Sequence, residues 1–289
     1  MLWLTLALCA ALCTAATDTL SKRFFSDFKA FEMALIRLVY AAPILVIAFL
    51  FVPRPELDAT FWTCIAAALP LEVAARLCYM QAIKVSPLSL TVPFLSFTPA
   101  FIILTGYLFL DEVLSGSGIL GIGCIVTGSY VLNLNKAREQ WIKPFTAIFR
   151  ERGSRLMLLT SFLYAFTAPL GKVAILHSSP AFFAVTYFLC LIVLMLLLFP
   201  ALPDLRARNL IARPLPGMVT GVVSAAVIFS HTLAISLVEA AYMISIKRTS
   251  LLFGVLFGAV VFHESHIRER LLGASMMLAG VFLIALSSE

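Results

Sequence analysis

Residues Ala240–Glu264 read AAYMISIKRTSLLFGVLFGAVVFHE and are long enough to cross a bilayer as one helix, at about 1.5 Å of rise per residue. Lys247 and Arg248 lie about two turns inside this apolar run. A charge there costs roughly 2.5 to 3.5 kcal/mol on insertion unless it faces a polar cavity or an anion. We therefore interpret Lys247 and Arg248 as candidate ligand-binding residues. The alternative is a cation pair whose side chains reach out to the membrane surface.

The predicted helix presents the two cations on different faces, because adjacent helical positions diverge by about 100°. Lys247 shares a stripe with Leu251, Gly254 and Gly258. Small residues let helices approach closely, so this stripe is predicted to face a helix bundle.

The composition is that of a protein with many membrane spans. Apolar residues make up 62% of the chain and charged residues 12%, against about 25% charged in soluble domains. The net charge of +6 is spread over short loops, so it indicates membrane topology rather than a nucleic-acid partner. The six cysteines all lie in apolar runs, where we expect small buried residues rather than disulfides or metal ligands. No metal or other cofactor is expected.

Apolar runs separated by turn residues and charges predict ten transmembrane helices. The first run lacks a basic start and is long for a signal peptide, so we interpret it as a spanning helix. The predicted helices cover 2–21, 31–52, 60–83, 88–110, 116–134, 154–175, 181–199, 215–236, 240–262 and 267–286.

The two halves of the chain match when they are overlaid with a shift of 152 residues. Because each half holds five predicted helices, an odd number, the second half must cross the membrane in the opposite sense. The sequence thus predicts an all-α membrane protein with two inverted five-helix repeats, residues 1–134 and 154–289, joined by a loop at 135–153. The matches are Ala82 with Ala234, Ile83 with Ile235, Gly106 with Gly258, Glu112 with Glu264, Gly121 with Gly273 and Gly128 with Gly280.

Lys and Arg are distributed unequally between the two sides of the predicted bundle. Fifteen lie in the loops that follow the odd-numbered helices, and two, Arg54 and Lys172, lie on the opposite side. The excess of positive charge on cytoplasmic loops then places the central loop in the cytoplasm and both termini outside.

The run YMQAIKVSPLSLTVPFLSFTPAFIILTGYLFLDE, residues 79–112, is followed by GIGCIVTGSYVL, and FGVLFGAVVFHE in the second half is followed by LLGASMMLAGVFLIAL. Together with Arg37 in the second helix, their order, spacing and duplication resemble the EamA family of the drug/metabolite transporter superfamily. The resemblance covers nearly the whole chain and implies a ten-helix, inverted-repeat bundle with a central cavity that moves small organic solutes. Several superfamily members have both termini in the cytoplasm, opposite to the charge count, so both orientations stay open.

The run IKRTS, Ile246–Ser250, is similar to the Lys-Arg pair on the ninth helix of phosphate-ester exchangers in the same superfamily. This similarity implies that Lys247 and Arg248 contact the anionic group of a substrate. We expect a multi-pass protein of a bacterial or archaeal plasma membrane.

Further polar residues lie within the predicted helices. Glu72 and Arg76 are four residues apart on one helix face, and Tyr79 continues the stripe. They form either a structural ion pair or a functional one, in which Glu72 carries a proton or Arg76 contacts an anion. Arg37 either lines the cavity or reaches the membrane surface. His231 is either a hydrogen-bonded interior residue or a proton carrier.

The acidic residues at two helix ends have a structural interpretation. Asp111-Glu112 and His263-Glu264 precede the predicted helices 116–134 and 267–286, which their carboxylates are expected to cap. The run HESH at 263–266 is not the metalloprotease motif HExxH, because its second histidine comes one residue early. Lys172, at a helix end, is expected to anchor at the membrane interface.

These features predict a secondary-active transporter, not an enzyme, for a small organic solute that bears a carboxylate or phosphate. No Walker A motif is present to bind ATP. Alternating access at a central cavity would use Lys247 and Arg248 to hold the anionic group, with Arg37 or Arg76 assisting and a proton or counter-substrate as coupling partner. The alternatives are a flippase for a lipid or lipid-linked head group on the same bundle and, remotely, an integral membrane enzyme.

Overall fold

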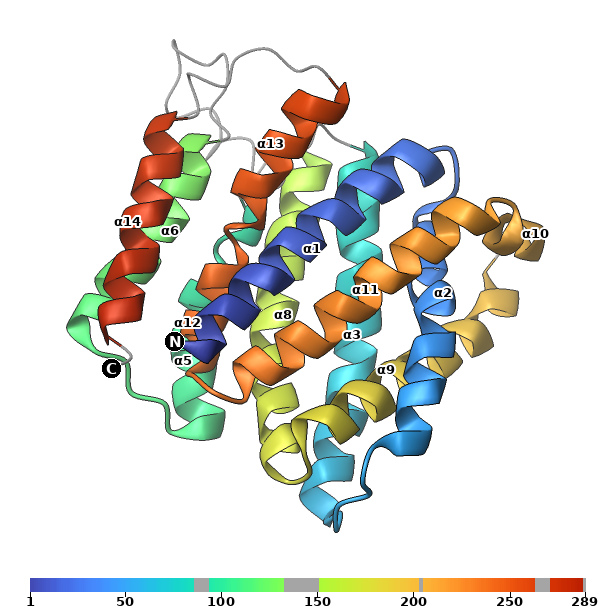
Figure 1. Cartoon of the computed structure of the whole chain (residues 1–289), viewed down its shortest axis with the longest axis horizontal. Coiled ribbons are helices and arrows are strands. Elements are labelled where there is room, and N and C mark those ends of the chain that lie inside the picture. Colours follow the sequence, from blue (N-terminus) through green and yellow to red (C-terminus); the bar gives the residue numbers. More distant parts are fainter. Residues whose placement is uncertain (86–93, 133–150, 203–204, 263–270, 288–289) are drawn as a thin grey trace.

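The computed structural model describes residues 1–85, 94–132, 151–202, 205–262 and 271–287, and every regular element in these ranges is helical. Helices α6 and α14 pair at the left of the bundle in Figure 1, while α2, α9 and α10 lie at the right. The elements are α1 (Leu2–Phe25), α2 (Ala30–Phe51), α3 (Ala59–Val85), α5 (Thr98–Leu110), α6 (Gly116–Leu132), α8 (Arg152–Leu176), α9 (Pro180–Leu198), η1 (Phe199–Ala201), α10 (Ala207–Ile211), α11 (Pro214–Ile235), α12 (Ala240–Lys247), α13 (Ser250–Phe262) and α14 (Leu271–Ser287).

Six of these helices are long and apolar enough to cross a membrane: α1, α2, α3, α8, α9 and α11. Shorter apolar helices cover Thr98–Leu110, Gly116–Val131 and Leu272–Ser287. The chain is therefore an all-α, multi-pass membrane protein. Most of the observed helices begin and end within a few residues of the predicted ranges, as for α2 at Ala30–Phe51. The short elements η1 and α10, which precede α11, were not predicted.

The predicted single helix 240–262 is wrong, because the chain forms two helices, α12 and α13, separated by a turn at Arg248–Thr249. The N–H groups of Thr249, Leu251 and Leu252 each donate to the carbonyl three residues earlier, which tightens the backbone and ends α12. The predicted helix 88–110 is likewise interrupted by a turn at Ser96–Phe97, which precedes α5, and its part at 88–93 lies outside the described residues. The two turns are 152 residues apart, from 96 to 248, which is the shift that relates the two halves in sequence.

Helices α6 and α14 approach so closely that only glycine fits at their contacts. A Cβ atom added at Gly121 would lie 2.9 Å from the carbonyl oxygen of Gly280, and one at Gly128 would lie 2.8 Å from that of Gly273. Gly254 differs, because a Cβ there would meet nothing within 4 Å. The predicted close-packing role of Gly254 is therefore wrong, because a side chain there would meet open space.

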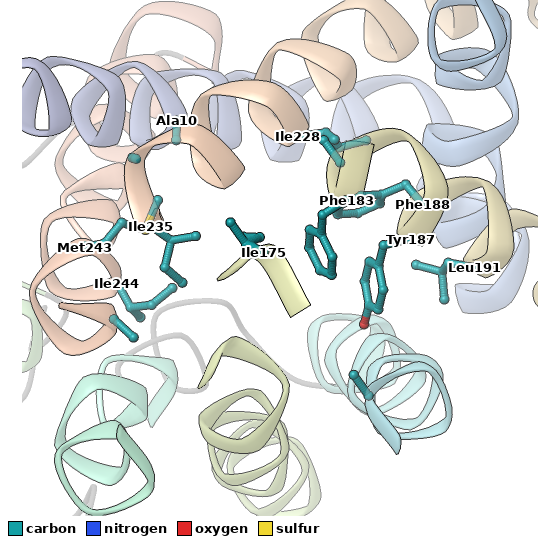
Figure 2. Close-up of a cluster of buried hydrophobic side chains, with 14 of the residues drawn as sticks. Ala10, Ile175, Phe183, Tyr187, Phe188, Leu191, Ile228, Ile235, Met243 and Ile244 are labelled. Carbon is teal, nitrogen blue, oxygen red and sulfur yellow. The ribbon is translucent and has the colours of Figure 1, made fainter. Parts of the chain in front are cut away.

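The larger buried core joins elements from across the chain, and part of it is shown in Figure 2. Phe183 and Tyr187 of α9 stack with ring centroids 5.0 Å apart and an interplanar angle of 18°. Ile175 of α8, Ile235 of α11 and Met243 of α12 are buried in the same core. The hydroxyl of Tyr187 points away from Phe183 and towards α3 (Figure 2). This core thus ends at a polar region beside α3.

Candidate functional site

A cluster of charged side chains lies among α1, α2, α3, α5, α8, α11 and α12. We call its six charged members the cationic cluster, since it has four cations and two carboxylates. Four of these six charges lie close enough to act on the hydroxyl of Tyr164 on α8. Lys247 is itself one of the six, and four of the other five act on its amine. The members of the cationic cluster are Arg37, Arg76, Lys247, Arg248, Asp18 and Glu72.

Asp18 joins the first three helices through its carboxylate. The guanidinium of Arg37 on α2 places Nη2 2.9 Å from Oδ1 of Asp18. The hydroxyl of Tyr79 on α3 donates to Oδ2 over 3.3 Å. Arg37 also donates from Nε to the Ser21 hydroxyl, 2.8 Å away on α1. Arg37 is thus directed inward to α1, and the alternative of a side chain that reaches the membrane surface does not hold.

Glu72 and Arg76 form the ion pair expected from their spacing, with 2.8 Å between Arg76 Nη2 and Glu72 Oε1. The Arg76 guanidinium also lies over the ring of Phe188 on α9, 5.8 Å from its centroid. The charges of Glu72 and Arg76 both act on Tyr187, whose hydroxyl points towards α3. The nearby aromatic rings limit the space around this pair.

Lys247 and Arg248 lie where α12 ends. The Lys247 ammonium is 3.4 Å from Nδ1 of His231 on α11. An ammonium can only donate, so a charged Lys247 requires a neutral His231 that accepts at Nδ1. Arg248 donates from Nη2 to the hydroxyl of Thr98, 2.8 Å away at the start of α5. The turn between α12 and α13 therefore directs one cation to α11 and the other to α5.

All seven residues predicted from the sequence lie in or beside this cluster. His231 is within electrostatic range of Lys247, Arg248 and Arg76, and Tyr79 is within range of Arg37 and Arg248. Sequence reasoning missed Asp18, Thr98, Tyr164 and Tyr187. Only Asp18 gave a signal, as a carboxylate in the apolar run of the first helix.

The cluster is partly exposed rather than sealed in the core. The Arg37 side chain is 13% exposed and that of Arg76 is 20% exposed, while Asp18 reaches 37%. Lys247 and Arg248 are also partly exposed, although the neighbouring Ile246 is fully buried. In the described part of the chain, the Nε atoms of Arg76 and Arg248 are buried without a hydrogen-bond partner. Each of these guanidinium groups therefore keeps one unsatisfied donor, which protein atoms enclose in this structure.

A second ion pair joins segments that are far apart in sequence. Lys172 on α8 places its ammonium 2.5 Å from Oε1 of Glu112, directly after α5, and 2.7 Å from the carbonyl of Val238. Glu112 also accepts the N–H of Ala240, at 2.9 Å from Oε2, and so caps α12. A Cβ at Gly106 would lie 3.1 Å from the same oxygen, so the glycine leaves room for the carboxylate.

Two predictions about this region are therefore wrong. Glu112 does not cap the helix that follows it, because its carboxylate contacts α12 instead, and the Ser115 hydroxyl accepts the N–H of Gly118 in α6. Lys172 is not an interfacial anchor, because its ammonium is held by Glu112 and Val238 and its side chain is only 11% exposed. The corresponding prediction for His263-Glu264 lies outside the described residues.

Other charged contacts lie at the edges of the bundle. Arg213 at the start of α11 pairs with Asp27, with 2.9 Å between Nη2 and Oδ2. Asp58, before α3, accepts the N–H of Phe61 and contacts His177 at 2.7 Å. The Phe61 N–H is the main cause of a lowered pKa of the Asp58 carboxyl, and His177 adds to it. Both pairs are about half exposed.

No group of three or more His, Cys, Asp or Glu side chains capable of holding a metal occurs in the part of the chain that the structure describes. The polar atoms of the cationic cluster are mainly nitrogen donors, which suit an anion.

Comparisons with known proteins agree with the fold. The EamA-like transporter family matches residues 1–134 and again residues 152–286. A solved structure described only as "Crystal structure of protein" shares the fold, with a TM-score of 0.73 and 11% sequence identity over 99% of this chain and 96% of that chain. No curated protein matches the sequence. Because the family covers both halves of the sequence, the chain belongs to the EamA-like transporter family, a family of transporters for small solutes.

Proposed function

We propose that the protein is a secondary-active transporter of a small organic anion that bears a carboxylate or a phosphate. The cationic cluster carries this proposal. Asp18 is paired with Arg37 and Glu72 with Arg76, whereas neither Lys247 nor Arg248 has a carboxylate partner among the described residues. Two partly buried cations without counter-ions are costly in a membrane protein. An anion bound between them would offset that cost.

The two unpaired cations can recognise an anion in complementary ways. The guanidinium of Arg248 is planar and suits two-point contact with a carboxylate or phosphate, and its Nε donor is unused in the described structure. Thr98 holds the other side of that guanidinium at 2.8 Å from Nη2. The Lys247 ammonium adds a compact charge from the end of α12. The contact with His231 fixes the direction of the lysine side chain.

Reciprocal packing supports two inverted repeats at residues 1–134 and 154–289, with 135–153 as their connection. Under a shift of 152 residues, the close contact of Gly121 with Gly280 becomes that of Gly273 with Gly128, which is the second close contact observed. The pairing of α3 with α8 likewise becomes that of α11 with α1, and α5 with α8 becomes α13 with α1. Such exchange is expected of two units related by a twofold axis.

The cationic cluster draws on both of these repeats. Asp18, Arg37, Glu72 and Arg76 come from the first, and Lys247 and Arg248 from the second. Discontinuous helices at such an interface are typical of transporters in which two repeats rock about a fixed site. The turns before α5 and α13 are discontinuities of this kind. We propose that rocking of the repeats exposes the bound anion to one side of the membrane and then to the other.

A thermal-stability screen of purified protein tests the anion site. Inorganic sulfate, oxalate, organic carboxylates and phosphate esters are compared with amines, neutral solutes and anionic phospholipid. A ligand stabilises by RT ln(1 + [L]/Kd), about 2.7 kcal/mol at a concentration of 100 Kd, so weak ligands register at high concentration. We expect stabilisation by at least one class of soluble anion.

Two variants give the screen its specificity. Lys247→Gln/Arg248→Gln should remain folded and lose the anion effect, whereas Arg208→Gln, which removes an exposed cation on α10, should retain it. Equal stabilisation of all three proteins would contradict the proposed site. Stabilisation by amines or neutral solutes alone would contradict the anionic substrate, and stabilisation by phospholipid alone would favour a lipid head-group flippase.

A further inference from the structure

Asp18 is a charged residue of the cluster whose presence is not explained by anion binding to Lys247 and Arg248. Its carboxylate holds Arg37 at 2.9 Å and receives the Tyr79 hydroxyl at 3.3 Å, so it connects α1 to α2 and α3. The side chain is 37% exposed, the highest value among the residues of the two ion pairs in the cluster. Of the two carboxylates in the cluster, that of Asp18 is therefore the less enclosed by protein.

The groups around Asp18 are mostly cationic. Arg37 faces it from α2, Tyr79 from α3, and the charges of Lys247 and Arg248 act on it from the end of α12. Helices α11 and α13 also pack along α1. The titratable residue of α11 is His231, which contacts Lys247, and the sequence of α13 contains no titratable residue.

Glu72 is less suited to give up its charge. Its side chain is 10% exposed, and its partner Arg76 lies one turn away on the same helix. Because both residues belong to α3, this ion pair does not depend on the positions of the other helices. The Asp18–Arg37 pair instead spans two helices, and Arg37 has a second anchor in the Ser21 hydroxyl at 2.8 Å. Arg37 can therefore stay in place when Asp18 releases it.

We propose that Asp18 couples anion binding to proton uptake. This inference rests on the proposed anion site. Without an anion, the Asp18 carboxylate is paired with Arg37, as in the structure. Arg37 and Arg248 both lie close to Tyr79, so an anion held by Lys247 and Arg248 can also take over the Arg37 guanidinium. A proton from the solvent then adds to a carboxylate oxygen of Asp18, the ion pair breaks, and the neutral acid remains beside Tyr79. About one proton accompanies each anion.

The physical reason is charge balance in a poorly solvated region. An anion and the Asp18 carboxylate compete for the same guanidinium and repel each other, so each binds more favourably when the other is absent or neutral. Anion binding and protonation of Asp18 therefore favour one another by linkage. Anion affinity therefore rises as pH falls, by up to about tenfold per pH unit where binding is accompanied by the uptake of one proton.

Proton uptake on anion binding is the test. Sulfate and oxalate serve as probes because both are fully ionised near neutral pH and release or take up no proton themselves. Each is added to purified protein in weakly buffered detergent solution with a pH indicator, and binding is measured in parallel by thermal stabilisation. Asp18→Asn keeps the size of the side chain and resembles the protonated acid.

The matched control is Asp27→Asn. It removes the same kind of carboxylate from an Asp–Arg pair with the same 2.9 Å separation, at the edge of the bundle. We expect wild type and Asp27→Asn to take up about one proton per bound anion. Asp18→Asn should bind the anion with about one proton less uptake than wild type, and its Kd should depend less steeply on pH than that of wild type.

The outcomes separate the coupling from the transport site. Proton uptake as large in Asp18→Asn as in wild type, or anion binding to wild type without uptake across the whole pH range, would overturn the role of Asp18 and leave the anion site intact. Failure of every anion in the thermal screen to bind wild type would overturn the anion site, and the coupling with it. Proton uptake on binding of a neutral solute that is lost in Asp18→Asn would contradict the proposed competition between an anion and the Asp18 carboxylate for Arg37.

Discussion

Removal of the Glu112 carboxylate is expected to destabilise the protein strongly, because it has two partners and is nearly buried. The carboxylate pairs with Lys172 at 2.5 Å and accepts the N–H of Ala240 at 2.9 Å, and the Lys172 ammonium also reaches the Val238 carbonyl. The two charged side chains are 9% and 11% exposed. Breaking a buried pair from one side costs about 3 to 5 kcal/mol. Since Lys172 keeps one carbonyl partner, we expect about 3 kcal/mol for Glu112→Ala.

The variant Glu112→Gln should be milder, because the amide oxygen still accepts from Ala240 and only the charge is lost. We expect a loss of about 1 to 2 kcal/mol. The unfolding free energy in mixed detergent micelles measures both variants. A double-mutant cycle with Lys172→Met isolates the pair, and its coupling energy should be about 1 to 3 kcal/mol. A cost below about 0.5 kcal/mol for Glu112→Ala, or additive single variants, would refute this interpretation.

The Phe61 N–H is the main cause of the lowered pKa of the Asp58 carboxyl in the folded protein. The stabilisation from this contact is complete above the ordinary Asp pKa of about 3.9, and it is lost as pH falls through the lower pKa of the folded protein. The unfolding midpoint of wild type should therefore decline below about pH 4 more steeply than that of Asp58→Asn, and parallel curves would contradict this. Gly221→Ala should cost about 1 to 3 kcal/mol of unfolding free energy, because its Cβ would lie 2.4 Å from the Tyr40 carbonyl oxygen and force α11 away from α2. Gly254→Ala is its control, because a Cβ there would meet nothing within 4 Å. An equal loss of unfolding free energy in both variants would show that the contact of Gly221 with Tyr40 does not limit the side chain at this position. Thr98→Val, which removes the acceptor of the Arg248 bond, should weaken oxalate or sulfate binding roughly fivefold, whereas Thr98→Ser should bind as wild type does. Similar binding by Thr98→Val and Thr98→Ser would exclude a positioning role for the hydroxyl.

The helices were predictable from sequence because a membrane imposes its own length and polarity. A spanning segment must be apolar for about 20 residues and must satisfy its backbone hydrogen bonds internally. The predicted range 31–52 accordingly corresponds to α2 at Ala30–Phe51. The turn at Arg248–Thr249 was not predictable in this way, because every residue from 240 to 262 is compatible with a continuous helix and no proline marks the site.

The residues of the site were predictable where a charge in an apolar run has few structural explanations, as for Lys247 and Arg248. Their partners were not. Arg248 meets Thr98, which is 150 residues away, and Glu112 caps Ala240, which is 128 residues away. Sequence spacing reveals neighbours within one helix, as for Glu72 and Arg76, whereas these contacts depend on how separate helices pack.

Counterflow in proteoliposomes tests most directly whether the cationic cluster carries an anion across the membrane. Vesicles are preloaded with the anion that stabilises the protein most strongly, and labelled anion is supplied outside. Wild type and Arg208→Gln should accumulate label transiently, and Lys247→Gln/Arg248→Gln should not. Transport through Lys247 and Arg248 would be contradicted if wild type binds the anion without counterflow. It would also be contradicted if Lys247→Gln/Arg248→Gln exchanges the anion as fast as wild type does.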